Sequence, residues 1–180
     1  IMKKIALYAI CVIIVSSCSR DKNVSENTDI NIVQEINMDN KTLNFESTRR
    51  EGSAHSGKYY SSVDTVNQFA VGYEYILPDT LKKRNVTVYV SCWVREKEMP
   101  FNGGVAIALS TTKGTINWHV SDLKKSVTKS NEWVFVKDSI FYEKALLNDP
   151  FVQIGVVGIK QVGSDALDID DLKINYKFSE

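Results

Sequence analysis

The chain has 180 residues, and its 22 lysines and arginines balance its 22 aspartates and glutamates, so the formal net charge is zero. This balance excludes the clustered basic face that nucleic-acid binding requires. A chain of this length, with 43% hydrophobic residues, is expected to form one domain with a substantial core.

The chain begins with a segment typical of exported proteins. We take Met2 as the effective start; Lys3 and Lys4 then form a short positive region, and residues 5–15 (IALYAICVIIV) are uninterrupted apolar. A run of this length fits the core of a secretory signal peptide and falls short of the ~20 residues that span a bilayer as a helix. Removing residues 1–17 takes away the two lysines and leaves the rest slightly acidic.

This segment ends in VSSC, in which an aliphatic and two small residues precede Cys18. The pattern resembles the bacterial lipobox, whose cysteine becomes the lipidated first residue of the mature protein; an ordinary signal peptide that happens to contain a cysteine is the alternative. The resemblance implies a membrane anchor on Cys18, stable because two or more acyl chains are attached. The following CSRDKN is similar to the surface-export signals of Bacteroides-type lipoproteins. We expect an outer-membrane protein, on the periplasmic or the surface face.

Composition divides the remainder into a tether and a domain. Residues 18–40 are polar and lack aromatic residues, so we interpret them as the lipidated cysteine and a flexible tether, although INIVQEI within them could form a short edge strand. Residues 41–180 are the expected domain. Since Cys11 lies in the signal peptide and Cys18 is the anchor, Cys92 is the only thiol of the domain and no internal disulfide can form.

The domain is β in character throughout. Short runs with strand patterning alternate with turn sequences such as LPDT, TTKGT and LNDP, and no window carries a convincing helical apolar stripe. Eight or nine short strands at this spacing predict an all-β, antiparallel, two-sheet β-sandwich (jelly roll). The expected strands are residues 42–47, 57–64, 68–77, 85–95, 104–111, 115–120, 132–141, 151–160 and 167–177.

The clearest strand is NVTVYVSCWVRE. Its valines and Cys92 alternate strictly with larger or polar residues, which predicts a strand with one buried face. Cys92 is then a small core residue. The opposite face, which we expect to point outward, carries Thr87, Tyr89, Ser91, Trp93 and Arg95.

The order of three further motifs is informative. NFES opens the domain, HSGKYY follows, and LDIDDLKI lies close to the end. Together they resemble the galactose-binding-like jelly rolls, the fold of many carbohydrate-binding modules attached to glycan-degrading enzymes. The likeness covers about residues 41–178.

The resemblance implies one structural calcium ion, held by carboxylates of Glu46 and Asp170 and the backbone carbonyl of Lys58. Calcium takes six to eight oxygen ligands, so further carbonyls or water would complete the set. In the metal-free alternative Asp168 and Asp171 are solvated and Asp170 bonds a turn amide. Alternation places Asp171 on the opposite face from Asp168 and Asp170, so all three can serve one site only if the strand contains a bulge.

Glycan binding is the function that the resemblance implies. Sugar recognition needs flat aromatic faces for the pyranose C–H groups and polar side chains for the hydroxyls. Tyr89, Trp93 and Arg95 on the outward face offer these groups, and Trp118 could join them from a neighbouring strand or loop. The alternative is that these aromatic side chains pack within the fold.

Two other functions stay open. A structural or adhesive domain that contacts outer-membrane proteins suits exposed strand faces equally well. A glycan-active hydrolase needs two acids across a cleft, whereas the clustered acids here lie in one terminal strand, and motifs of nucleophilic or zinc catalysis are absent. We therefore expect a protein that is not an enzyme, and we interpret His55 as tying down its turn rather than as a general base.

Overall fold

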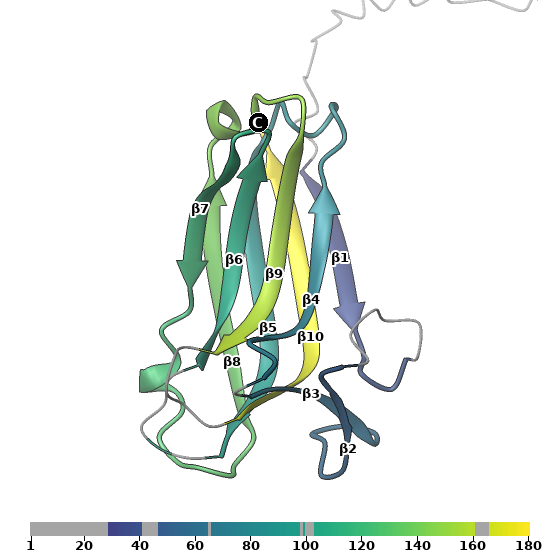
Figure 1. The fold of residues 1–180 in the computed structure, drawn as a ribbon. Coiled ribbons are helices and arrows are strands. Elements are labelled where there is room, and N and C mark those ends of the chain that lie inside the picture. Colours follow the sequence, from purple (N-terminus) through teal and green to yellow (C-terminus); the bar gives the residue numbers. More distant parts are fainter. Residues whose placement is uncertain (1–28, 41–46, 65, 98, 100–102, 161–165) are drawn as a thin grey trace, which may run out of the picture.

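Two antiparallel β-sheets pack face to face in the computed structural model (Figure 1). The structure describes residues 29–40, 47–64, 66–97, 99, 103–160 and 166–180. The predicted all-β two-sheet sandwich is confirmed, with ten strands in the described residues instead of eight or nine.

The larger sheet has six strands in the order β2-β3-β10-β5-β8, with β1 also paired to β10. We call it sheet A. Its strands are β1 (Ile30–Ile36), β2 (Arg49–Glu51), β3 (Tyr59–Val63), β5 (Asn85–Glu96), β8 (Val134–Tyr142) and β10 (Leu167–Ser179).

The smaller sheet, sheet B, has four strands in the order β4-β9-β6-β7. They are β4 (Phe69–Ile76), β6 (Gly103–Thr111), β7 (Gly114–Val120) and β9 (Val152–Lys160). Two short 3-10 helices, η1 (Leu123–Lys125) and η2 (Lys144–Leu147), lie in the connections before and after β8. In the described residues no helix is long and apolar enough to cross a membrane.

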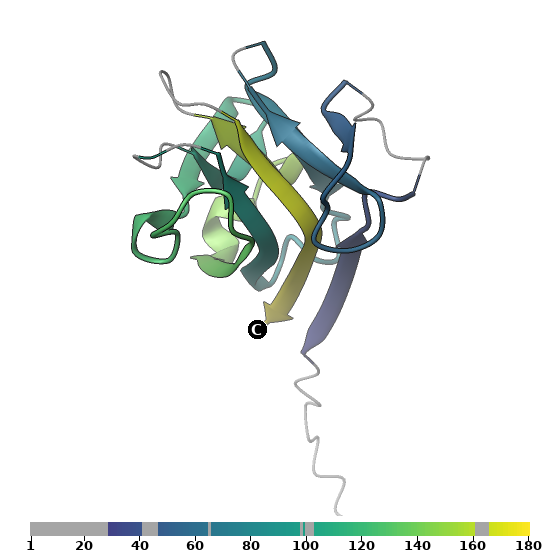
Figure 2. The same ribbon diagram turned by 90° about the horizontal axis from the view of Figure 1, so that it is seen from below.

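Strand β1 lies at the edge of sheet A, beside the last strand of the chain (Figures 1 and 2). Its register places Ile30 opposite Phe178 and Ile36 opposite Leu172. We included the segment INIVQEI in the tether, with an edge strand as the alternative. The structure shows the edge strand, so the sandwich begins before residue 41. The strand expected at residues 42–47 lies almost wholly outside the described residues.

The core lies between the two sheets, as the alternation in β5 predicted. Val86, Val88, Val90, Cys92 and Val94 are each at most 4% exposed. Burial raises the pKa of the Cys92 thiol to about 12, so this cysteine is a protonated core residue at neutral pH.

Strand β10 contains a β-bulge that changes which residues face the core. Leu167 and Ile169 point inward before the bulge, and Leu172, Ile174, Tyr176 and Phe178 point inward after it. The register to β5 shifts between Asp170 and Lys173, and Asp171 has a φ of 49°. One extra residue therefore turns the strand so that Asp168, Asp170 and Asp171 all lie on the outer side of sheet A.

Candidate functional site

Asp168 and Arg95 form a buried ion pair on the outer side of sheet A. Asp168 is fully buried, and its Oδ2 accepts hydrogen bonds from Arg95 Nε at 3.0 Å and Nη2 at 2.7 Å. Arg95 Nη1 donates to the carbonyl of Ser53 at 2.7 Å. All three guanidinium nitrogens are thus committed to the fold, so the structure gives Arg95 a packing contact where we expected a ligand contact.

His55 covers Trp93. The two rings stack with centroids 3.8 Å apart and an angle of 13° between their planes, and His55 Nδ1 lies 2.9 Å from Oδ2 of Asp171. This is the packing alternative for Trp93, and it matches our interpretation of His55 as a residue that holds its turn. Asp171 is therefore engaged with the turn and not simply solvated, and Asp168 is not solvated at all.

Asp170 is fully buried beneath the same turn. Its Oδ2 accepts the backbone N–H groups of His55 at 2.9 Å and Ser56 at 3.0 Å. Burial raises the pKa of Asp170 above its ordinary value; bonds from the backbone amides oppose this effect and the charge of Asp171 adds to it. Among the described residues, Asp170 forms no ion pair with lysine, arginine or histidine.

The other two members of the expected calcium set are placed differently. The Lys58 carbonyl accepts the Gly52 amide at 3.0 Å, and Glu46 lies outside the described residues. Within the part of the chain that the structure describes, no group of three or more His, Cys, Asp or Glu side chains gathers closely enough to hold a metal ion.

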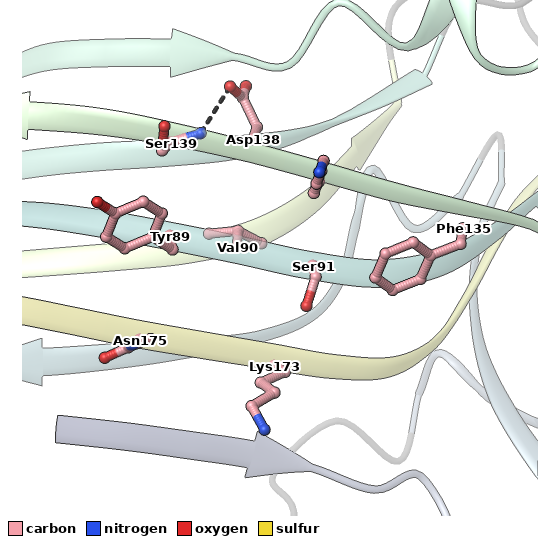
Figure 3. Close-up of a pocket in the computed structure, with 9 residues that line it drawn as sticks. Tyr89, Val90, Ser91, Phe135, Asp138, Ser139, Lys173 and Asn175 are labelled. Carbon is pink, nitrogen blue, oxygen red and sulfur yellow. Dashed lines mark hydrogen bonds between the residues drawn. The ribbon is translucent and has the colours of Figure 1, made fainter. Parts of the chain in front are cut away.

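A groove of about 640 Å³ runs over the outer face of sheet A. Tyr89 and Phe135 are 45% and 50% exposed, and their rings lie along the sheet with one face turned outward (Figure 3). The short side chain of Ser91 lies between the two rings (Figure 3). We call this surface the Tyr89 groove; it is lined by Tyr89, Val90, Ser91, Phe135, Lys137, Asp138, Ser139, Lys173 and Asn175.

A second groove, of about 370 Å³, crosses the outer face of sheet B. Trp118 is 49% exposed at one side of it. Because Trp118 belongs to sheet B and Tyr89 to sheet A, the two aromatic residues that we expected in one platform lie on opposite faces. We call this surface the Trp118 groove; it is lined by Phe69, Gly72, Tyr73, Glu74, Ala108, Ser110, Thr115, Trp118, Gln153, Gly155, Val156 and Val157.

Strand register explains the shape of the Trp118 groove. Glu74 pairs with Gly155, Gly155 with Ala108, and Ala108 with Trp118, so these four residues form one row across all four strands. The two middle members carry no side chain or only a methyl group. The groove therefore has a flat backbone floor, with an indole wall and a carboxylate wall about 14 Å apart at the backbone.

At the edge of the sandwich, His119 bridges β7 to β8. Its Nε2 lies 2.8 Å from Oδ2 of Asp138. Burial raises the pKa of Asp138, but side-chain hydrogen bonds with Ser121 and His119 outweigh it and lower the pKa overall. Serine and histidine both contact the carboxylate, whereas nucleophilic catalysis needs the histidine between the other two. This cluster therefore joins the sheets and does not activate Ser121.

No family model and no curated protein match the chain. Solved structures that are similar to it include VP2 of an infectious bursal disease virus subviral particle, at 10% identity and a TM-score of 0.46, covering 83% of this chain and 33% of that one. A second is the CBM22-1 xylan-binding domain of Paenibacillus barcinonensis Xyn10C, at 14% identity and a TM-score of 0.44, covering 82% of this chain and 85% of that one. A third is the C-terminal CBM6 of LamC, a marine laminarinase from Zobellia galactanivorans, at 12% identity and a TM-score of 0.41, covering 79% of this chain and 98% of that one. The chain thus spans a third of VP2, and at these values no function passes from any of the three to this chain.

The sequence did not reveal most of the groove residues. Alternation in VFVKDSIFY could have placed Phe135, Lys137 and Ser139 on one face of β8. The flat floor of the Trp118 groove depends on Gly155 and Ala108 becoming neighbours across two strands, and only the register supplies that information.

The buried ion pair leads to a stability prediction. Replacing Arg95 with methionine leaves the Asp168 carboxylate buried without its main partner, so we expect the free energy of unfolding to fall by about 3–5 kcal/mol. Lys97, whose Nζ lies 3.7 Å from Asp168 and whose side chain is 42% exposed, provides the control. Lys97→Met should cost less than about 1 kcal/mol. Urea denaturation of both variants measures the difference, and equal losses would contradict the assigned role of Arg95.

Proposed function

We propose that this domain binds a glycan without chemically changing it, and that the Trp118 groove is the binding site. The observation that supports this proposal is the flat floor formed by Gly155 and Ala108 between Trp118 and Glu74. A sugar ring can approach the backbone there because no large side chain stands in its way. Concave sites with an aromatic wall and a few polar groups are the usual form of small-ligand sites.

The chemistry of the groove walls suits a neutral sugar. The exposed indole of Trp118 offers a face to the pyranose C–H groups, while Glu74, Gln153 and Ser110 offer acceptors and donors to the hydroxyls. Among the described residues that line the groove, Glu74 is the only acid. Glycoside hydrolysis uses a pair of carboxyl groups about 5–9.5 Å apart, so this arrangement favours binding over turnover.

Two substitutions test the groove. Gly155→Leu fills the floor, and the fold should accept it because a Cβ at this position meets only Glu74 Cγ, at 4.0 Å. Trp118→Ala removes the stacking wall. For the tightest-binding neutral oligosaccharide on a glycan array, we expect calorimetry to show affinity at least about tenfold weaker for each variant. Ile76→Ala, which alters an exposed residue of the same strand as Glu74 outside the groove lining, should bind normally. Undiminished binding by both groove variants would refute the proposal.

We also propose that the chain is a lipoprotein of the outer membrane, anchored through Cys18, which lies outside the described residues. Residues 19–29 separate this cysteine from β1. The resemblance of VSSC to the lipobox supports the proposal. We expect Cys18→Ser to abolish incorporation of labelled palmitate and to release the protein from the membrane fraction. Wild-type protein that is cleaved but carries no label would show an ordinary signal peptide instead.

A structural calcium ion at Asp170 is the third part of the proposal. A fully buried carboxylate without a cationic side chain against it, among the described residues, suits a divalent cation, which would offset the cost of burial. Asp170 and the Lys58 carbonyl would be two of its ligands, and Glu46 a third. Such an ion would tie the closing strand to the turn at residues 52–58.

Removing the metal tests this site. Millimolar calcium should raise the melting temperature by several degrees over that in chelator, because a ligand that binds only the folded state stabilises it. Asp170→Asn should abolish the calcium response, while Asp79→Asn, which changes a carboxylate that is 93% exposed, should leave it intact. A melting temperature that is identical with calcium and with chelator would rule out the ion.

A further inference from the structure

The Tyr89 groove contains a row of two lysines with a serine between them. Lys173 of β10 pairs with Ser91 of β5, and Ser91 pairs with Lys137 of β8. Since neighbouring strands lie about 4.8 Å apart, the two lysine backbones are about 10 Å apart. Ser91 contributes only a short side chain between them, and the Lys173 ammonium group extends toward β1 (Figure 3).

The charge of this row is not balanced. Lys173 forms an ion pair with Glu35 of β1, with Nζ and Oε1 2.6 Å apart. Lys137 is exposed, and among the described residues its ammonium group forms no ion pair and no hydrogen bond. Asp138, which follows it in β8 and also contributes to the groove lining, binds His119 through its carboxylate. Two ammonium groups thus share one carboxylate, and the row has a net positive charge.

Aromatic rings lie on both sides of the row. Tyr89 lies two residues before Ser91 in β5, on one side of the row. Phe135 lies two residues before Lys137 in β8, on the other side. Both rings turn a face outward (Figure 3). The polar side chains of Ser91 and Asn175 line the groove beside these rings. The surface therefore combines two stacking faces, short polar side chains and an ammonium group without a carboxylate partner within one groove.

We propose that the Tyr89 groove is a second saccharide site, selective for sugars that carry a carboxylate or sulfate group. The pyranose ring stacks on Tyr89 or Phe135. Its anionic substituent lies over Ser91 and accepts charge-assisted hydrogen bonds from Lys137 and Lys173. The anion thereby supplies the countercharge that the row lacks. This site lies on the opposite sheet from the Trp118 groove and does not depend on it.

The test uses the Trp118→Ala chain, so that binding in the other groove does not contribute. The probes are arrayed uronate- and sulfate-bearing oligosaccharides, each beside its methyl-esterified or desulfated counterpart. We expect charged members to bind at least about tenfold more tightly than their neutral counterparts. Lys137→Gln should remove most of this preference, whereas Tyr89→Ala should weaken the charged and neutral sugars alike. Glu35→Gln, which frees Lys173, should strengthen binding of the charged sugars.

Lys177→Gln is the matched control. Lys177 lies on the same outer face of β10 and also carries one positive charge, but it pairs with Asp29 at 2.9 Å and does not line the groove. Equal losses in Lys137→Gln and Lys177→Gln would show general charge attraction and overturn the proposal. It is overturned as well if no charged sugar binds better than its neutral counterpart, or if the array retains no sugar at all.

Discussion

The bulge in β10 is the constraint on which much of the structure depends. A regular strand would send Asp170 and Asp171 to opposite sides of the sheet, and one of them would enter an aliphatic core. The extra residue keeps the carboxylates outside and returns Leu172 to the core. It also divides one edge of β10 between two partners, β3 before the bulge and β1 after it.

The carboxylates that the bulge gathers are covered by one turn. Residues 52–58 supply amide groups to Asp170, a carbonyl to Arg95 and the ring of His55 to Trp93. The side chains of this corner thus contact the turn and one another, and Asp168 and Asp170 are fully buried beneath it. The two grooves lie elsewhere, on the flat outer faces, where register and not burial determines which side chains meet.

Local pattern and long-range pairing account for different parts of this fold. Alternation over residues 85–96 predicted the buried face of β5 and the outward direction of Tyr89, because the period of a strand is a local property. Alternation could not show that His55, far away in sequence, covers Trp93, or that Lys173, Ser91 and Lys137 form one row. The sequence did not predict the bulge itself. It showed only that Asp168, Asp170 and Asp171 could share one face if the strand contained a bulge.

The position of β1 has a mechanical consequence. The chain enters this strand at Ile30, beside Phe178 near the end of β10, and then runs antiparallel to β10 as far as Ile36 (Figure 1). Tension applied to the chain ahead of Ile30, directed away from the sandwich, acts along the strand axis. The cross-strand bonds of β1 then share the load in shear and do not open one after another. If the domain is held through the chain that precedes β1, this strand bears the force first, and its pairing with β10 resists unfolding.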